Sequence, residues 1–229
     1  MKTLYVMALV IAGAMSLAAQ EKIITESEYR EALSRAEKAL YGGTHGPVRQ
    51  LMETEVLTEG RPETDYRLRS VTMIVPGQGN HRVEDRSFGG KPTKTESLTI
   101  NDRSFIRGLD GVWKNVSSSS RPPTEAAKPP ASTSRPIEGE ATYKYLGIQK
   151  VGDREIHVFT RWERKKSIND AGVTNDSESV TKVSIGTDGT YFRNEMNTKN
   201  SFSGKTGSIK IVIEIQTDPS IKLVPPVVS

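Results

Sequence analysis

The chain has 229 residues, a formal net charge of +4 and no cysteine, and 26% of its residues are charged. Charges of both signs are interleaved, as in Trp162 to Lys166, which argues against a nucleic-acid-binding surface. The lack of cysteine excludes disulfides and thiolate metal ligands. A chain of this length is long enough to bury one sizeable core.

The N-terminus carries an apolar run. Lys2 precedes apolar residues 4–17, and Ala18 and Ala19 follow before the chain turns polar. These three parts are typical of a secretory signal peptide, and the run is short for a membrane span. We expect a signal peptide over 1–19, a single domain over 20–229 and a periplasmic or secreted location. Without a cysteine for lipid attachment, the mature chain should have no stable membrane anchor.

One amphipathic helix is predicted directly after this segment. Thr25 and Glu28 have the spacing of a capping box. Apolar side chains then recur along one stripe of about four turns, and Gly42 and Gly43 end the pattern. The opposite face is charged. The stripe consists of Tyr29, Leu33, Ala36 and Leu40.

From about residue 51 the pattern predicts strands. Short segments rich in β-branched and aromatic residues alternate with turn pairs such as Asp110-Gly111 and Asp188-Gly189. Such pairs favour tight hairpins, so neighbouring strands should be antiparallel. With one helix and roughly nine to eleven strands, the fold class is α+β. The predicted strands include 66–69, 71–75, 97–100, 142–146, 155–159, 180–185 and 208–215.

The two faces of the predicted sheet are unequal. Ile209, Ile211 and Ile213 point one way from their strand, and Ile156 and Val158 oppose His157 on another. One helix cannot cover so wide an apolar face. We therefore expect the helix to pack on a strongly curved antiparallel sheet.

Residues 117–136 interrupt the strand pattern. This stretch holds five prolines and no large apolar residue, a composition that keeps a chain extended and disordered. We interpret it as a long insertion at a sheet rim. A linker between two domains is the alternative.

No catalytic or metal-binding motif stands out. His45, His81 and His157 lack a partner at helical ligand spacing, and the serines form no nucleophile motif. We interpret His157 as a solvated sheet residue, and Glu84 and Asp85 as the wet edge of a hairpin. We expect a non-enzymatic protein with no cofactor and no metal.

Three stretches resemble the periplasmic LolA/LolB-type lipoprotein-carrier fold, which LppX and the sensory domain of RseB share. They are residues 98–113, residues 143–158 and the closing segment 217–225. The resemblance implies a half-open β-barrel with the helix plugging an apolar cavity. It also implies lipid or acyl chains as cargo.

The curved apolar sheet and the resemblance together predict a lipid-binding, carrier-like protein of the bacterial envelope. An acyl chain would lie between the helix and the concave sheet face. The alternative is an interaction or envelope-stress sensing module of the RseB type, with an envelope protein as partner. Trp113 would frame a pocket mouth or pack at an edge. The predicted lining residues, which a filled core would also explain, are Leu33, Leu40, Leu68, Met73, Leu98, Ile100, Phe105, Trp113, Ile156, Val158, Ile209, Ile211 and Ile213.

Overall fold

The computed structural model describes residues 21–41, 46–116, 135–169, 172–202 and 204–228. The predicted signal peptide lies outside these residues. So does the predicted insertion, apart from Arg135 and Pro136, which begin a strand. The elements are β1 (Lys22–Ile24), α1 (Glu26–Tyr41), β2 (Val48–Thr58), the 3₁₀ helix η1 (Pro62–Thr64), β3 (Tyr66–Val75), β4 (Gly79–Phe88), β5 (Lys91–Ile100), β6 (Arg103–Arg107), β7 (Trp113–Val116), β8 (Arg135–Val151), β9 (Arg154–Ile168), β10 (Thr174–Gly186), β11 (Tyr191–Phe202) and β12 (Lys205–Thr217).

The helix begins at the predicted capping box. The backbone N–H of Thr25 donates to Glu28 Oε2 at 2.7 Å, and the backbone N–H of Glu28 donates to Thr25 Oγ1 at 3.2 Å. These bonds satisfy N–H groups that the first turn leaves without helical partners, and they confirm the predicted start. Within the described chain, no helix is long and apolar enough to cross a membrane.

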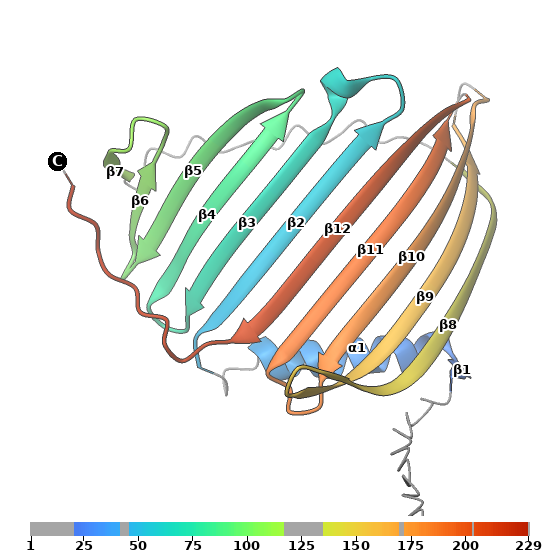
Figure 1. Ribbon diagram of the computed structural model, residues 1–229, viewed down its shortest axis with the longest axis horizontal. Helices are drawn as coiled ribbons and strands as arrows, with labels where there is room; N and C mark the ends of the chain where they lie inside the picture. The colour runs from blue at the N-terminus through green and yellow to red at the C-terminus, as the bar shows by residue number, and fades with distance from the viewer. Residues whose placement is uncertain (1–20, 42–45, 117–134, 170–171, 203, 229) are drawn as a thin grey trace, which may run out of the picture.

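The strands form one twelve-stranded sheet in the order β1-β8-β9-β10-β11-β12-β2-β3-β4-β5-β6-β7. Every neighbouring pair is antiparallel. Two runs of consecutive strands, β2 to β7 and β8 to β12, are joined by the pairing of β12 with β2 (Figure 1). The predicted α+β class, with an antiparallel sheet and one helix, is confirmed.

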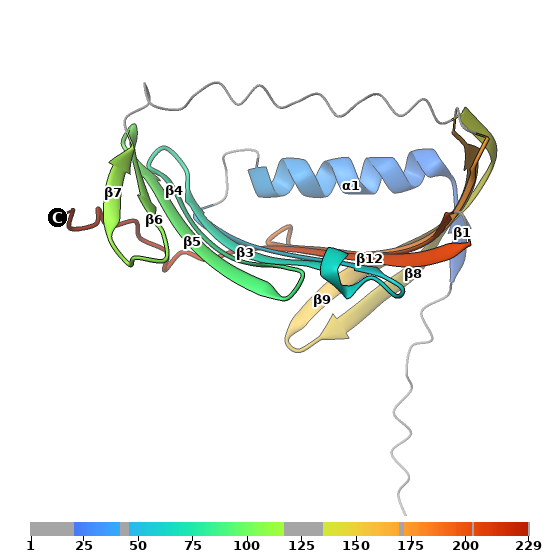
Figure 2. The same cartoon turned by 90° about the horizontal axis from the view of Figure 1, so that it is seen from above.

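The sheet is open and curled around the helix. Among the described residues, its ends, β1 and β7, each pair with a strand on one side only. Figure 2 shows both sides of the sheet bending toward α1, while the tip of the β8–β9 hairpin projects the other way. We call the face on the side of α1 the helix face and the opposite one the outer face.

The connection from β1 to β2 sets the course of the helix. These strands are six positions apart in the sheet, about 29 Å at ~4.8 Å per strand. The 16 residues of α1 extend ~24 Å. The helix therefore crosses the strands, and the curl of the sheet shortens the remaining distance (Figure 1).

Two buried clusters combine α1 with the sheet. In the first, Tyr29 and Ala36 of the helix join Val183 and Ile185 of β10. In the second, Leu40 joins residues of β2 and β12. A third cluster lies on the outer face, and Leu223 of the C-terminal segment packs against it. Its buried members are Leu98, Ile100 and Phe105.

Candidate functional site

An apolar strip continues the helix face beyond α1. Ile213 packs in the cluster of Leu40, and alternate residues of a strand share a face, so Ile211 and Ile209 also point to the helix side. Both are half-buried. Directly paired residues on neighbouring strands share that face too. We call the apolar members the open strip: Met196, Ile209, Ile211, Val56 and Leu68.

The helix leaves this strip partly exposed. Among the described residues, neither cluster that contains α1 includes a member of the open strip. Figure 1 shows why, because α1 crosses the strands near one end, and Val56 lies close to the other end of β2. A contiguous, partly exposed apolar surface inside a concave face is a feature of ligand-binding sites.

Charged side chains bound the strip on β9. Arg161 lies opposite Thr181 of β10 in the sheet register, and Thr181 lies opposite Met196 of β11. The Arg161 Nη2 atom lies 2.5 Å from Glu163 Oε1, and its guanidinium carbon lies 5.8 Å from the centre of the Tyr143 ring. This border of the strip is therefore polar.

A buried carboxylate bounds the strip on β4. Glu84 is 8% exposed and forms ion pairs with Arg82 and, at 2.8 Å, with Arg86. Arg82 Nε also donates to Ser70 Oγ at 3.0 Å. The interpretation of Glu84 as a wet edge was wrong, because two arginine side chains cover it, whereas its neighbour Asp85 is exposed.

A crevice of about 330 Å³ runs beside α1. Ala32, Ala36 and Ala39 form its helix wall, and their small side chains leave the space open. His157 belongs to the sheet wall, where its Nδ1 lies 2.8 Å from the Tyr145 hydroxyl. His157 is thus half-buried and hydrogen-bonded rather than solvated. Burial raises the pKa of the Tyr145 phenol.

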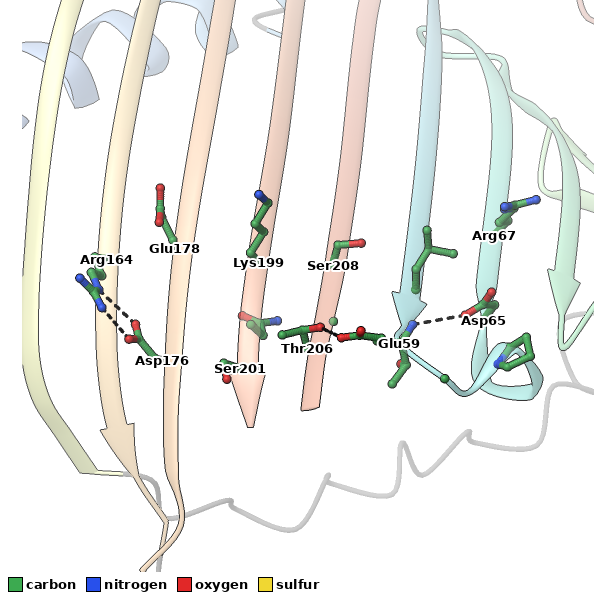
Figure 3. A pocket seen from close by; sticks show the side chains of 16 residues that line it. Glu59, Asp65, Arg67, Arg164, Asp176, Glu178, Lys199, Ser201, Thr206 and Ser208 are labelled. Carbon is green, nitrogen blue, oxygen red and sulfur yellow. Dashed lines mark hydrogen bonds and ion pairs between the residues drawn. The ribbon is translucent and has the colours of Figure 1, made fainter. Parts of the chain in front are cut away.

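A depression of about 820 Å³ lies on the outer face and is lined by charged side chains (Figure 3). Arg164 Nη2 lies 2.7 Å from Asp176 Oδ2, and Glu59 accepts a hydrogen bond from Thr206. Lys199 projects between these pairs. Most of the residues that line the depression are polar or charged, and the apolar ligand predicted from the sequence fits the helix face better.

The register separates the predicted lining residues into two groups. Those on α1 or the helix face are Leu33, Leu40, Leu68, Ile209, Ile211 and Ile213. Those on the outer face are Met73, Leu98, Ile100, Phe105, Trp113, Ile156 and Val158. The structure brings Ile209, Ile211 and Leu68 into one surface. Met196 and Val56 were not predicted as lining residues, although both follow from alternation once their strands are placed.

The helix face offers an apolar surface on which a ligand can bind. Within the described ranges, no group of three or more His, Asp or Glu side chains is placed to hold a metal ion. The charged groups that bound the strip are held in ion pairs, Arg161 with Glu163 on β9 and Glu84 with Arg82 and Arg86 on β4. What the helix face provides is apolar surface with charged borders.

Comparisons with known proteins yield one similar structure. No protein-family model matches the chain, and no curated protein is significantly similar to it. A solved LolA superfamily protein from Nitrosomonas europaea is 7% identical, with a TM-score of 0.29 over 82% of this chain and 93% of that chain. It belongs to the family that the sequence stretches resemble. Because this score is low, the function proposed below rests on the chain's own side chains.

Proposed function

We propose that this protein is a non-enzymatic binding protein for an apolar chain, such as the acyl chain of a lipid. The single observation that supports the proposal is the open strip, an apolar surface that also includes Thr54 between Ile211 and Leu68 and that α1 leaves half-exposed inside the curl of the sheet. An acyl chain lying on it would remove water from the strip and from the side of the chain that faces the sheet. Such a site needs no catalytic group.

The expected affinity follows from the area that the chain buries. Each buried methylene contributes about 0.8 kcal/mol, so roughly ten methylenes supply about 8 kcal/mol. Before the cost of association, that free energy corresponds to a Kd of about 1 μM. The strip alone can therefore give at most micromolar affinity. Such an affinity suits a carrier that must release its ligand.

We also propose export to the bacterial envelope, supported by the apolar run over residues 4–17 and the small residues Ala18 and Ala19. Expression of the full chain in a bacterium, followed by fractionation and N-terminal sequencing, tests this. The expected mature protein begins at Ala19 or Gln20 in the exported fraction. Retention of Met1 in the cytosolic fraction would contradict it.

Calorimetric titration of the purified mature protein with 1-monolauroylglycerol, below its micellar concentration, tests the binding function. Ile211→Asn places a polar amide in the middle of the strip and should weaken binding by about tenfold or more, because it removes apolar contact and adds a desolvation cost. Lys210→Asn is the matched control on the adjacent residue of β12, which is exposed on the outer face. Equal losses in both variants would refute the site.

The second candidate is the protein-interaction module. It is favoured by the β6–β7 hairpin at the end of the sheet, where Leu109 is 78% exposed and Ile106 and Val112 are 44% and 40% exposed. A partner strand would pair with the free edge of β7. Lipid copurifying with the protein in native mass spectrometry would favour the binding protein. A lipid-free protein whose envelope cross-links disappear in Leu109→Ser would favour the module.

A further inference from the structure

The guanidinium group of Arg161 has a buried donor without a partner. Its Nε atom is shielded from solvent, and no hydrogen-bond acceptor meets it among the described residues. The side chain as a whole is 32% exposed, so other parts of it face solvent, and Nε becomes accessible to a ligand when the side chain rotates. A buried unsatisfied N–H costs stability, and in native proteins such groups call for an explanation.

The neighbouring carboxylate leaves the positive charge of Arg161 incompletely balanced. Glu163 contacts Arg161 through Oε1, and the same oxygen lies 3.0 Å from Lys165 Nζ. A hydrogen bond and the charge of Arg30 lower the pKa of Glu26 on α1, and the charge of Arg161 adds to that shift. The main partner of Glu26 is Arg30, at 2.5 Å. Each carboxylate near Arg161 is thus shared with a second cation.

The unsatisfied donor and the open strip lie on the same face. Arg161 pairs with Thr181, Thr181 with Met196 and Met196 with Ile211, so one register line joins the charge to the apolar surface. The line covers three strand spacings, about 14 Å. Arg161 also influences Tyr29 of α1: burial raises the pKa of Tyr29, and the charge of Arg161 opposes that shift. Arg161 therefore lies at the helix side of the sheet.

We infer that Arg161 receives the anionic headgroup of a single-chain amphiphile whose tail runs across β10 onto the Met196 and Ile211 end of the open strip. This deepens the proposed function and rests on it. A carboxylate oxygen accepts the hydrogen bond that Nε lacks after a small rotation of the side chain, and its charge complements the excess of cations around Glu163. The ligand class is then a fatty-acid-like carboxylate rather than a neutral or cationic lipid.

Three probes with a twelve-carbon chain separate the headgroup from the tail. They are dodecanoate, 1-monolauroylglycerol and dodecyltrimethylammonium, titrated calorimetrically below their micellar concentrations at about pH 7.5, where the carboxylate is ionised. The wild-type protein should bind dodecanoate roughly tenfold more tightly than the cationic probe, the gain expected of a charge-assisted hydrogen bond.

Variants of β9 assign that preference to one side chain. Arg161→Gln should bring the affinities for dodecanoate and the cationic probe close together while leaving that for monolauroylglycerol unchanged. Arg161→Lys keeps the charge and should retain part of the preference. Arg164→Gln is the matched control, because Arg164 lies on the outer face of the same strand and pairs with Asp176. Circular dichroism checks that each variant is folded.

The outcomes distinguish this inference from the proposed function. Binding of monolauroylglycerol without any preference for dodecanoate would overturn the role of Arg161 and leave the apolar site standing. A preference lost equally in Arg161→Gln and Arg164→Gln would also overturn it, since a general charge effect would then explain the result. No binding of any probe would overturn the proposed function and this inference together.

Discussion

The dependence of affinity on chain length is the prediction that follows most directly from the open strip. The perturbation is in the ligand: a series of 1-monoacylglycerols that differ by single methylenes. From Met196 on β11 to Leu68 on β3 the strip spans three strand spacings, about 14 Å at ~4.8 Å per strand. An extended chain advances ~1.25 Å per methylene with bonds of about 1.5 Å, so roughly eleven methylenes fill the strip.

Each methylene up to that length should contribute about 0.8 kcal/mol, a gain of roughly fourfold in affinity. Beyond about twelve to fourteen carbons the added methylenes meet solvent, and the gain should fall to less than about twofold. Calorimetric titration below the micellar concentration of each ligand measures the series. Affinity that does not depend on chain length would refute the reasoning. So would an unbroken rise through about eighteen carbons, since the strip could then not set the limit.

Three further predictions concern the elements that place the site. Thr25→Ala should lower the unfolding free energy by about 1 kcal/mol through loss of the capping box, whereas Thr25→Ser should retain most of it, as urea denaturation can show. Leu40→Ala should cost about 2 to 5 kcal/mol in the same assay, because Leu40 is 5% exposed between α1 and the sheet; a cost near that of a surface residue would contradict the packing. Hydrogen bonds from Thr190 hold the pKa of Asp188 below its ordinary value, so their contribution is present above about pH 4 and is lost as pH falls through the lowered native value. Asp188→Asn should flatten the acidic part of the pH–stability curve. An unchanged curve would contradict the stabilising role of these hydrogen bonds.

Local signals in the sequence predicted local structure well. The capping box formed by Thr25 and Glu28 depends on residues three apart, and the structure contains both of its hydrogen bonds. Hairpins at pairs such as Asp188-Gly189 likewise depend on neighbouring residues. Such interactions need no knowledge of the rest of the chain.

The faces of the strands could not be assigned from sequence. Alternation separates Ile156 and Val158 from His157, but it does not say which set turns toward the helix. The structure places Phe159 beside Tyr29, so His157 shares the helix face and Ile156 and Val158 lie opposite. On the outer face, Leu223 packs against the buried cluster at β5.

The arrangement of the sheet and of the open strip depends on pairing between strands that are far apart in the sequence. The pairing of β12 with β2 joins residues more than 150 positions apart, such as Ile211 and Thr54, and no local pattern predicts it. The open strip exists only because of that pairing. The burial of Glu84 between Arg82 and Arg86 could not be predicted from local pattern either, because alternating charges along a strand normally indicate a solvated face.

The location of a bound chain is the most direct test of the central claim. A monoacylglycerol of about twelve carbons with a photoreactive diazirine near the end of its chain, irradiated with the mature protein, would label the residues that it contacts. Peptide mass spectrometry should find the label on the open strip, at Ile209 or Ile211 of β12 and Val56 of β2. Labelling concentrated around Lys199 and Arg164 on the outer face would contradict the account.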